Sequence, residues 1–164
     1  MSSVATKMAP ANGQARILVL GYGNPGRQDD GLGPAMVAEI ERLAWRNVTA
    51  HDNYQLNIED AIDVAEHDIV WFVDAARAGP APYSMSDLSP ASGIEFTSHL
   101  VRPEVILAIA RQYYGGSPRA FLVGIRGYEF EFLEELTMEA KHNLRAALAM
   151  LGERIRSCQT GEAP

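Results

Sequence analysis

The sequence predicts a three-layer α/β/α sandwich, in which helices cover both faces of a mostly parallel central sheet of about five strands. Segments with strand-like and helix-like spacing alternate from Arg16 onward, which is typical of a parallel α/β sheet. The strand candidates are short continuous apolar runs, as expected for strands that are buried on both faces. A length of 164 residues with 47% hydrophobic content fits one domain with a substantial core.

The first half of the chain predicts three strands and two helices. Residues 17–20 are an apolar run that stops at a glycine-rich stretch, and Pro34 then suits the first turn of a helix. Residues 47–51 form the second strand candidate. Asn57, with an acidic residue three positions later, resembles the start of a second helix. Residues 68–74 contain the most apolar run, so we place them as the central strand.

The second half predicts an edge strand, a further buried strand and two helices. Residues 79–98 are rich in Pro and Ser and are mostly loop, with a weak edge strand at residues 83–88 that can run antiparallel. A helix follows at about residues 100–114, and residues 120–125 form another strand. Thr137 is a suitable cap for the last helix, which carries one apolar stripe.

Composition limits the classes of function. A single domain is predicted over residues 16–158, between a flexible leader at 1–15 and a flexible tail at 159–164. Fourteen Lys and Arg against 21 Asp and Glu give a net charge of −7, and a phosphate-backbone binder would need the opposite sign. The single cysteine, Cys158, cannot form an internal disulfide, and no apolar run is long enough to span a bilayer. We expect a cytoplasmic protein with no nucleic-acid or membrane partner.

The loop after the first strand reads GYGNPGRQDDGLG over residues 21–33. Its opening satisfies the G-x-G-x-x-G pattern of dinucleotide-binding sites, and Asp52 at the end of the second strand is an acidic residue that could hold a ribose; the glycines are Gly21, Gly23 and Gly26. One alternative function is therefore a Rossmann-like enzyme that binds NAD.

Two features of the same loop argue against a dinucleotide. Pro25 and Gly26 favour a turn, whereas the pyrophosphate needs a helix N-terminus inside the motif. Asp29 and Asp30 also put two carboxylates where phosphates would lie, with only Arg27 to offset them. A structural alternative is that the glycines shape a tight turn and the two aspartates are solvated or cap the next helix.

Three potential metal ligands are predicted at one edge of the sheet. Asp74 emerges at the end of the buried central strand, next to the strand that leads to Asp30, and His99 lies at the start of the following helix. Two carboxylates and an imidazole suit a borderline divalent ion such as nickel, zinc or iron. The alternative for His99 is a capping or partly buried residue. The other histidines, His51, His67 and His142, are predicted at the surface.

In this combination of motifs the sequence resembles the maturation endopeptidases of nickel-iron hydrogenases. Residues 21–33 are similar to that family's G-x-G-N-x-x-x-x-D-[DE]-G-x-G signature, residues 72–75 (FVDA) to its strand-three motif, and Ser98 with His99 to its third motif. The resemblance extends from Arg16 to about Ile155 and implies a phosphorylase/hydrolase-like α/β fold. The family's metal ligands correspond to Asp30, Asp74 and His99, the residues that the topology brings together.

The resemblance implies a protease that removes the C-terminal extension of a hydrogenase large-subunit precursor after nickel insertion. The nickel is carried by the precursor, and zinc or cadmium can stand in for it in the free enzyme. The attacking group is not identified, and Asp30 and Asp74 are the candidate catalytic carboxylates. We expect a monomer whose partner is the nickel-loaded precursor. A binding module that uses the same fold without chemistry is a third class of function.

Five further residues are candidates for substrate contact. Three belong to the signature and either shape the loop or touch the substrate: Asn24, Arg27 and Asp29. Tyr54 and Gln55 lie in residues 52–56 (DNYQL), where many members of the family carry a D-G-G-T type segment instead. This departure, together with residues 128–130, makes the chain similar to the branch that serves NAD-linked bidirectional hydrogenases.

Overall fold

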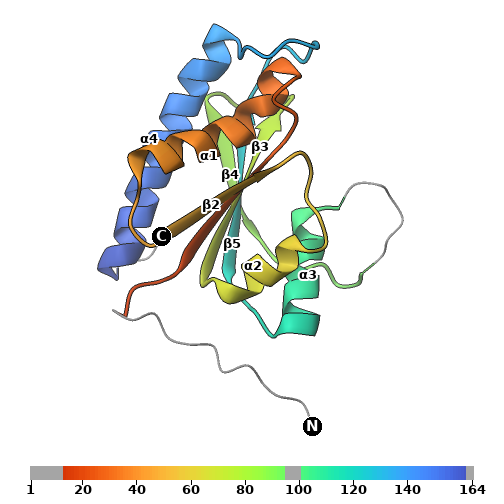
Figure 1. Ribbon diagram of the computed structural model, residues 1–164, viewed down its shortest axis with the longest axis vertical. Helices are drawn as coiled ribbons and strands as arrows, with labels where there is room; N and C mark the ends of the chain where they lie inside the picture. The colour runs from red at the N-terminus through yellow and green to blue at the C-terminus, as the bar shows by residue number, and fades with distance from the viewer. Residues whose placement is uncertain (1–12, 95–100, 162–164) are drawn as a thin grey trace.

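The computed structural model describes residues 13–94 and 101–161. Within them, each predicted strand and helix is present, and Figure 1 shows their arrangement. The elements are β1 (Ile17–Tyr22), a single 3-10 turn η1 (Gln28–Gly31), α1 (Leu32–Leu43), β2 (Val48–Asn53), α2 (Asp60–Glu66), β3 (Ile69–Ala76), β4 (Tyr83–Leu88), α3 (Pro103–Tyr114), β5 (Arg119–Arg126) and α4 (Met138–Thr160).

The five strands form one sheet in the order β2-β1-β3-β5-β4. Strands β2, β1, β3 and β5 are parallel to one another, and β4 is antiparallel to β5 at the edge. The central position of β3 and the antiparallel edge strand confirm the predicted sheet. Because the parallel strands point the same way, the segments that follow β1, β2, β3 and β5 all leave the sheet at one end, its carboxyl edge.

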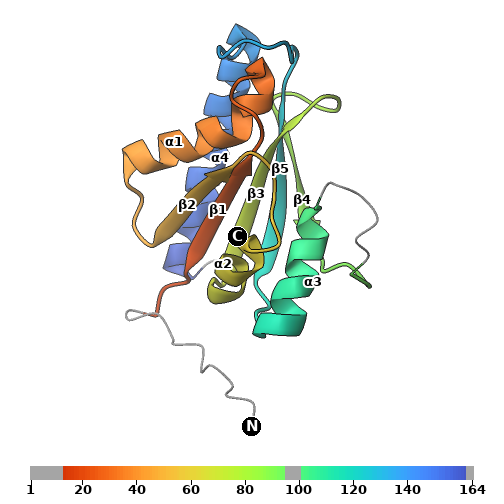
Figure 2. The ribbon, with the colours of Figure 1, turned by 45° about the vertical axis from the view of Figure 1, so that its right-hand side comes forward.

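Helices cover both faces of this sheet, which confirms the three-layer α/β/α fold class. Helices α1 and α4 lie on one face and α2 and α3 on the other (Figures 1 and 2). Strand residues alternate between the two layers, so that Trp71 belongs to the α1/α4 core and Phe72 to the α2/α3 core, both with no exposed surface. The Trp71 ring stacks on Phe121 with centroids 4.4 Å apart.

The ends of the helices follow from local sequence. The Thr137 hydroxyl accepts a hydrogen bond from the Ala140 amide, so it caps α4 as predicted. Helix α3 begins at Pro103, a residue that suits the first turn because it lacks an amide hydrogen. Helix α4 continues through Gln159 and Thr160, and the Gln159 side chain donates to the Arg46 carbonyl (2.6 Å).

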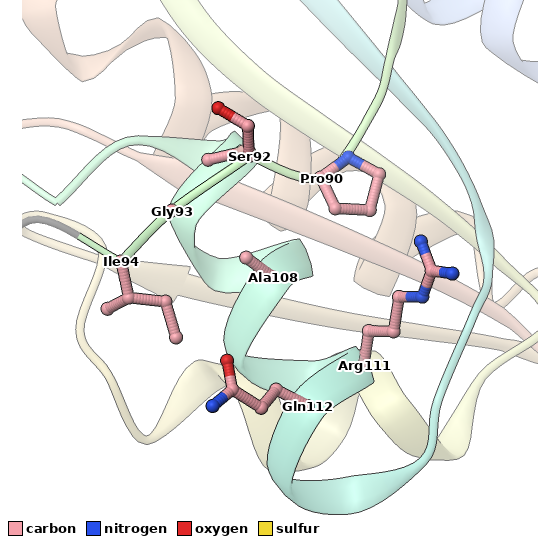
Figure 3. Close-up of a pocket in the computed structure, with 8 residues that line it drawn as sticks. Pro90, Ser92, Gly93, Ile94, Ala108, Arg111 and Gln112 are labelled. Carbon is pink, nitrogen blue, oxygen red and sulfur yellow. The ribbon is translucent and has the colours of Figure 1, made fainter.

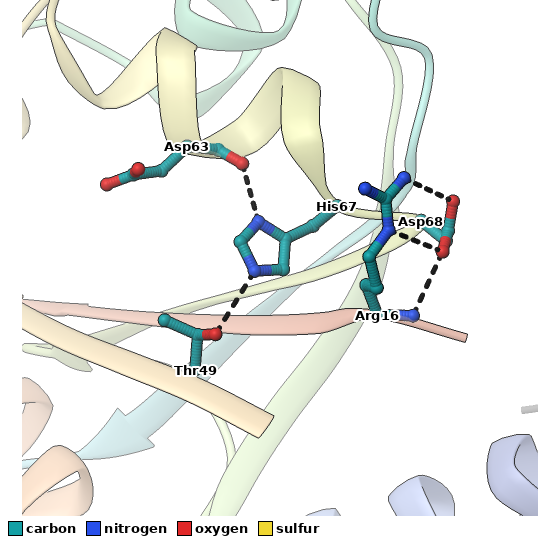
Figure 4. Close-up of polar contacts among 5 residues, drawn as sticks. All are labelled: Arg16, Thr49, Asp63, His67 and Asp68. Carbon is teal, nitrogen blue, oxygen red and sulfur yellow. Dashed lines mark hydrogen bonds and ion pairs between the residues drawn. The ribbon is translucent and has the colours of Figure 1, made fainter. Parts of the chain in front are cut away.

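Polar contacts stabilise the end of the sheet where the parallel strands begin, opposite the carboxyl edge (Figure 4). The Arg16 amide and guanidinium both reach the Asp68 carboxylate, at 2.9 and 3.4 Å. The His67 ring lies 2.6 Å from the Asp63 carbonyl through Nδ1 and 3.2 Å from the Thr49 hydroxyl through Nε2. The prediction of a surface His67 was therefore wrong. The ring is half-buried because it joins α2 to β2.

None of the helices in residues 13–94 and 101–161 combines the length and the apolar composition needed to cross a membrane.

Candidate functional site

The loop after β1 is packed tightly against the carboxyl ends of the two central strands. A Cβ atom added to Gly33 would lie 2.5 Å from the Tyr22 carbonyl oxygen and 2.7 Å from that of Val73. Both distances are shorter than real contacts of a Cβ atom, so only glycine allows this approach. The first turn of α1 is thereby seated directly on the ends of β1 and β3.

Hydrogen bonds within the loop place Asp30. The side-chain oxygen of Asn24 accepts a hydrogen bond from the Gly26 backbone amide (2.8 Å), and the Asn24 backbone amide donates one to Asp30 Oδ2 (2.9 Å). Gly23 has a φ of +139°, and a Cβ atom there would lie 2.0 Å from the Asp30 carbonyl oxygen. Asn24 therefore shapes the loop, and the carboxylate of half-buried Asp30 has further acceptor capacity.

Asp29 is fully buried, and its carboxylate bonds entirely within the protein. It accepts hydrogen bonds from the amides of Tyr128 (2.7 Å), Glu129 (3.2 Å) and Thr137 (2.8 Å), and from the Thr137 hydroxyl (2.8 Å). Oδ2 accepts three of these hydrogen bonds and Oδ1 accepts the one from the Thr137 amide, so both oxygens have partners within the protein. Of the two roles that the sequence left open for Asp29, the structure supports shaping the loop, because this carboxylate has no surface for a substrate to contact.

The partners of Asp29 belong to residues 127–137, which follow β5 and which we call the arm. Gln28 and Arg27 also bind the arm. The Gln28 amide donates to the Leu133 carbonyl (2.7 Å), and its side chain accepts from the Glu131 amide (3.0 Å). The Arg27 guanidinium donates to the Phe130 carbonyl at 3.3 Å. This link between η1 and the arm has no local signal in the sequence, since it joins residues about a hundred positions apart.

The two candidate carboxylates of the site come together at the carboxyl edge. Asp74 is half-buried near the end of β3, and its Oδ1 accepts a hydrogen bond from the Ala75 amide (2.8 Å). Burial raises the pKa of Asp74 to about 6; the Ala75 amide opposes that rise, and the negative charge of Asp30 adds to it. Asp30 is therefore close enough to act on the ionisation of Asp74, as the topology predicts.

Tyr22, a residue outside the predicted set, adjoins Asp74, and Glu104 in turn acts on Tyr22. The β1–β3 register pairs Gly21 with Val73, so the next residues of the two strands, Tyr22 and Asp74, point to the same face of the sheet. Burial, followed by the charges of Asp74 and Glu104, raises the pKa of Tyr22, so its hydroxyl keeps its proton. Tyr22 could have been identified from the sequence, because it lies in register with Asp74 on the neighbouring strand. No sequence pattern pointed to Glu104 on α3.

The other predicted contact residues lie at the end of β2. Tyr54 is 68% exposed, and Gln55 is also exposed. They follow Asn53, whose carbonyl accepts from the Gly23 amide (3.0 Å) and whose side chain donates to buried Asp60 (2.8 Å). The strand end is thus fixed beside the signature loop, and Tyr54 and Gln55 are open to solvent there.

His99 lies outside the described residues. Within the described ranges, no group of three His, Cys, Asp or Glu side chains is arranged to hold a metal ion. The described part of the site is the Asp30–Asp74 pair, and the chain that precedes α3 would have to supply the third ligand.

The local geometry does not favour a dinucleotide at the signature loop. Helix α1 begins at Leu32, beyond the G-x-G-x-x-G segment, so no helix N-terminus lies inside the motif to receive a pyrophosphate. The glycines instead allow close backbone packing, and neither aspartate caps α1 through its side chain. Asp52 is exposed at the end of β2.

A separate pocket of about 490 Å³ lies between residues 90–94 and α3 (Figure 3). Its polar side chains include those of Ser92, Arg111 and Gln112, and neither site carboxylate lines it. The pocket is therefore distinct from the Asp30–Asp74 pair.

Comparison with solved structures gives the same fold. The hydrogenase maturating endopeptidase HybD from E. coli matches with a TM-score of 0.68 and 24% identity, over 87% of this chain and 93% of that one. A [NiFe] hydrogenase maturation protease HycI from Thermococcus kodakarensis matches with a TM-score of 0.66 and 22% identity, over 88% and 94%. A hydrogenase 2 maturation peptidase from a Thaumarchaeota archaeon matches with a TM-score of 0.63 and 23% identity, over 85% and 97%.

The chain has the fold of hydrogenase maturation proteases. The matches cover nearly the full length of these proteins, so no large domain of theirs is missing from this chain. No protein-family model matches the sequence, and no curated protein matches it. At these identities the likeness shows the fold alone.

Proposed function

We propose that this protein is an endopeptidase that removes the C-terminal extension of a nickel-iron hydrogenase large-subunit precursor after nickel insertion. The observation that carries the proposal is the Asp30–Asp74 pair at the carboxyl edge of a sheet with the fold of such proteases. The sequence resemblance assigns metal recognition to these same two residues together with His99.

The physical chemistry of the pair supports a role in binding a cation. Asp74 is half-buried and near a second carboxylate, so its ionised form is disfavoured in the free protein. A divalent ion between the two groups would offset both the burial and the repulsion. Two oxygen ligands and the imidazole of His99 leave coordination positions open, which suits an ion that remains held by the precursor.

In the proposed reaction, water adds to the scissile carbonyl and the peptide C–N bond breaks, releasing the extension. The substrate-borne nickel polarises that carbonyl or lowers the pKa of a bound water. A carboxylate beside the scissile bond can accept the proton of the water, which makes Asp30 and Asp74 the candidate bases. Metal loading of the precursor then becomes the condition for cleavage.

A cleavage assay on the nickel-loaded precursor tests the proposal. We expect Asp30→Asn, Asp74→Asn and His99→Ala each to abolish processing while the protein stays folded. Asp87→Asn serves as the control, because Asp87 is an exposed aspartate on β4 that pairs with Phe121, away from the carboxyl edge. Normal cleavage by the His99 variant would defeat the proposed role of that residue.

A calorimetric titration of the metal-free protein separates this function from the dinucleotide alternative. Zinc and cadmium stand in for nickel, and NAD is the competing ligand. A one-to-one metal site that is lost in His99→Ala, without NAD binding, is the expected result. Tight NAD binding without a metal site would overturn the protease assignment.

The precursor class and the setting of the reaction are further parts of the proposal. Residues 52–56 and 128–130 favour a precursor of a soluble, NAD-linked bidirectional hydrogenase. We infer a monomeric enzyme that acts in the cytoplasm, where such a precursor would acquire its nickel.

A further inference from the structure

We propose that the arm is the docking surface for the precursor, and that it recognises a segment in which apolar side chains are flanked by Lys or Arg. The inference rests on the proposed function, since it names how the same site would select its partner. It concerns the exposed side chains of the arm and of Met138, which follows it at the start of α4, and not the carboxylates themselves.

Large apolar side chains are concentrated on this segment. Four of the ten exposed large hydrophobic residues in the described part of the chain fall between positions 128 and 138: Tyr128 (43% exposed), Phe132 (81%), Leu133 (58%) and Met138 (70%). Single exposed apolar residues are common on protein surfaces, but such a group on one short segment is typical of an interaction site. We call these four side chains the arm face.

The charges of the arm favour a basic partner. The charged residues of the segment GYEFEFLEELT are all glutamates, and the segment contains no Lys or Arg. Glu135 pairs with Lys141 (2.9 Å), whereas in the described structure Glu131 and Glu134 have no cationic partner. Nearby Arg27 lies against the Phe132 ring, 5.1 Å from its centre, and Arg77 against another ring of the arm. Unpaired negative charge beside exposed apolar groups is complementary to Lys or Arg beside apolar groups.

Hydrogen bonds from η1 hold the backbone of the arm in place. The Gln28 amide and side chain bind the Leu133 carbonyl and the Glu131 amide, and buried Asp29 binds both ends of the arm. A surface already fixed in the free protein loses little conformational entropy when it binds a partner. These contacts therefore favour a docking role for the arm.

The position of the arm places a docked partner next to the carboxylate pair. Asp29, which anchors the arm, is followed directly by Asp30 in the same 3-10 turn. Figures 1 and 2 show the segment after β5 beside the start of α1, at the end of the sheet where β1 and β3 finish. A segment bound to the arm face would lie near the site, so recognition and cleavage can act on one precursor molecule.

The test compares arm variants with a matched pair elsewhere on the surface. Phe132→Ser with Leu133→Ser removes the apolar contact, and Glu131→Gln with Glu134→Gln removes the charge without large structural change. The control is Tyr113→Ser with Tyr114→Ser, since these aromatics are 66% and 52% exposed at the far end of α3. Cleavage of the host's nickel-loaded large-subunit precursor is followed over a range of precursor concentrations, together with direct binding of that precursor.

We expect each arm variant to raise KM and weaken binding by tenfold or more, with kcat within about twofold of the wild type. Binding by the wild type is expected to weaken with added salt, and that of the glutamine variant to depend less on salt. If the wild type cleaves and the arm variants keep its KM, the docking inference is wrong while the proposed function stands. If the wild type neither binds nor cleaves the precursor, the proposed function fails and this inference fails with it.

Discussion

Replacing Asp74 with asparagine is expected to make the protein more stable at neutral pH. An unperturbed carboxyl has a pKa of 3.8, and burial with the charge of Asp30 raises that of Asp74 to about 6. At about 1.4 kcal/mol for each tenfold change, ionised Asp74 destabilises the folded state by at most about 3 kcal/mol. Asparagine carries no charge and can still accept the hydrogen bond from the Ala75 amide. Because the site is partly open to solvent, we expect a gain of about 1–3 kcal/mol.

The stability gained in Asp74→Asn is expected to increase with pH. Well below pH 3.8 the carboxyl is protonated in both the folded and the unfolded chain, so the charge of Asp74 costs the wild type no stability there. As pH rises from about 4 to about 6, the unfolded chain ionises first and the wild type loses stability. The gain in Asp74→Asn is therefore expected to be largest at pH 7.5 and to fall to about 0.5 kcal/mol at pH 4.

Urea unfolding of metal-free protein at the two pH values measures this effect, with a chelator present throughout. Asp52→Asn is the control, and as an exposed substitution it is expected to stay within about 0.5 kcal/mol of the wild type. An Asp74→Asn protein that is less stable than the wild type at pH 7.5, or equally stabilised at both pH values, would refute the argument that burial and Asp30 disfavour the charge.

Three further predictions concern the loop, the arm and the metal. Asp29→Ala leaves buried amides such as that of Tyr128 without an acceptor, and we expect a loss of about 3–5 kcal/mol in urea unfolding; near-wild-type stability would show that Asp29 does not hold the arm. Gly33→Ala puts a methyl group against two backbone carbonyls, and we expect a loss of about 2 kcal/mol or more, whereas Gly93→Ala, with nothing within 4 Å of its added Cβ atom, serves as the control that keeps stability. Zinc affinity, measured by calorimetry, is expected to fall about fivefold between pH 6 and pH 5 as Asp74 takes up a proton, and a flat profile would show that Asp74 is not a ligand.

Much of the fold could be predicted because its signals are local. The apolar runs of β1 and β3 and the capping residue Thr137 each depend on a few neighbouring positions, and the structure has them where the sequence indicated. The edge strand at Tyr83–Leu88 was predicted with the bounds that the structure shows. The juxtaposition of Asp30 with Asp74 also followed, because the topology of a parallel sheet brings the ends of adjacent strands together.

The predictions that failed or were missed depend on contacts between distant parts of the chain. His67 is a polar residue of a type that is common at protein surfaces. Its ring contacts Thr49 only because α2 packs on the sheet. The link from Gln28 to the arm joins residues 28 and 133 through the backbone. No periodicity or motif encodes such a pairing.

Asp29 and Asp30 show why a sequence motif alone could not distinguish the roles of its residues. The two residues are adjacent and chemically identical. The 3-10 turn nevertheless points Asp29 into the protein, where its carboxylate is fully buried and accepts hydrogen bonds from four donors. Asp30 stays half-buried and accepts one hydrogen bond, from the backbone amide of Asn24. Substituting either residue would reduce processing, so activity alone cannot separate them. Stability does, since Asp29 holds the arm through satisfied buried bonds, whereas Asp30 adds repulsion to the charge of Asp74. Asp30→Asn is therefore expected to preserve or increase stability while it removes cleavage.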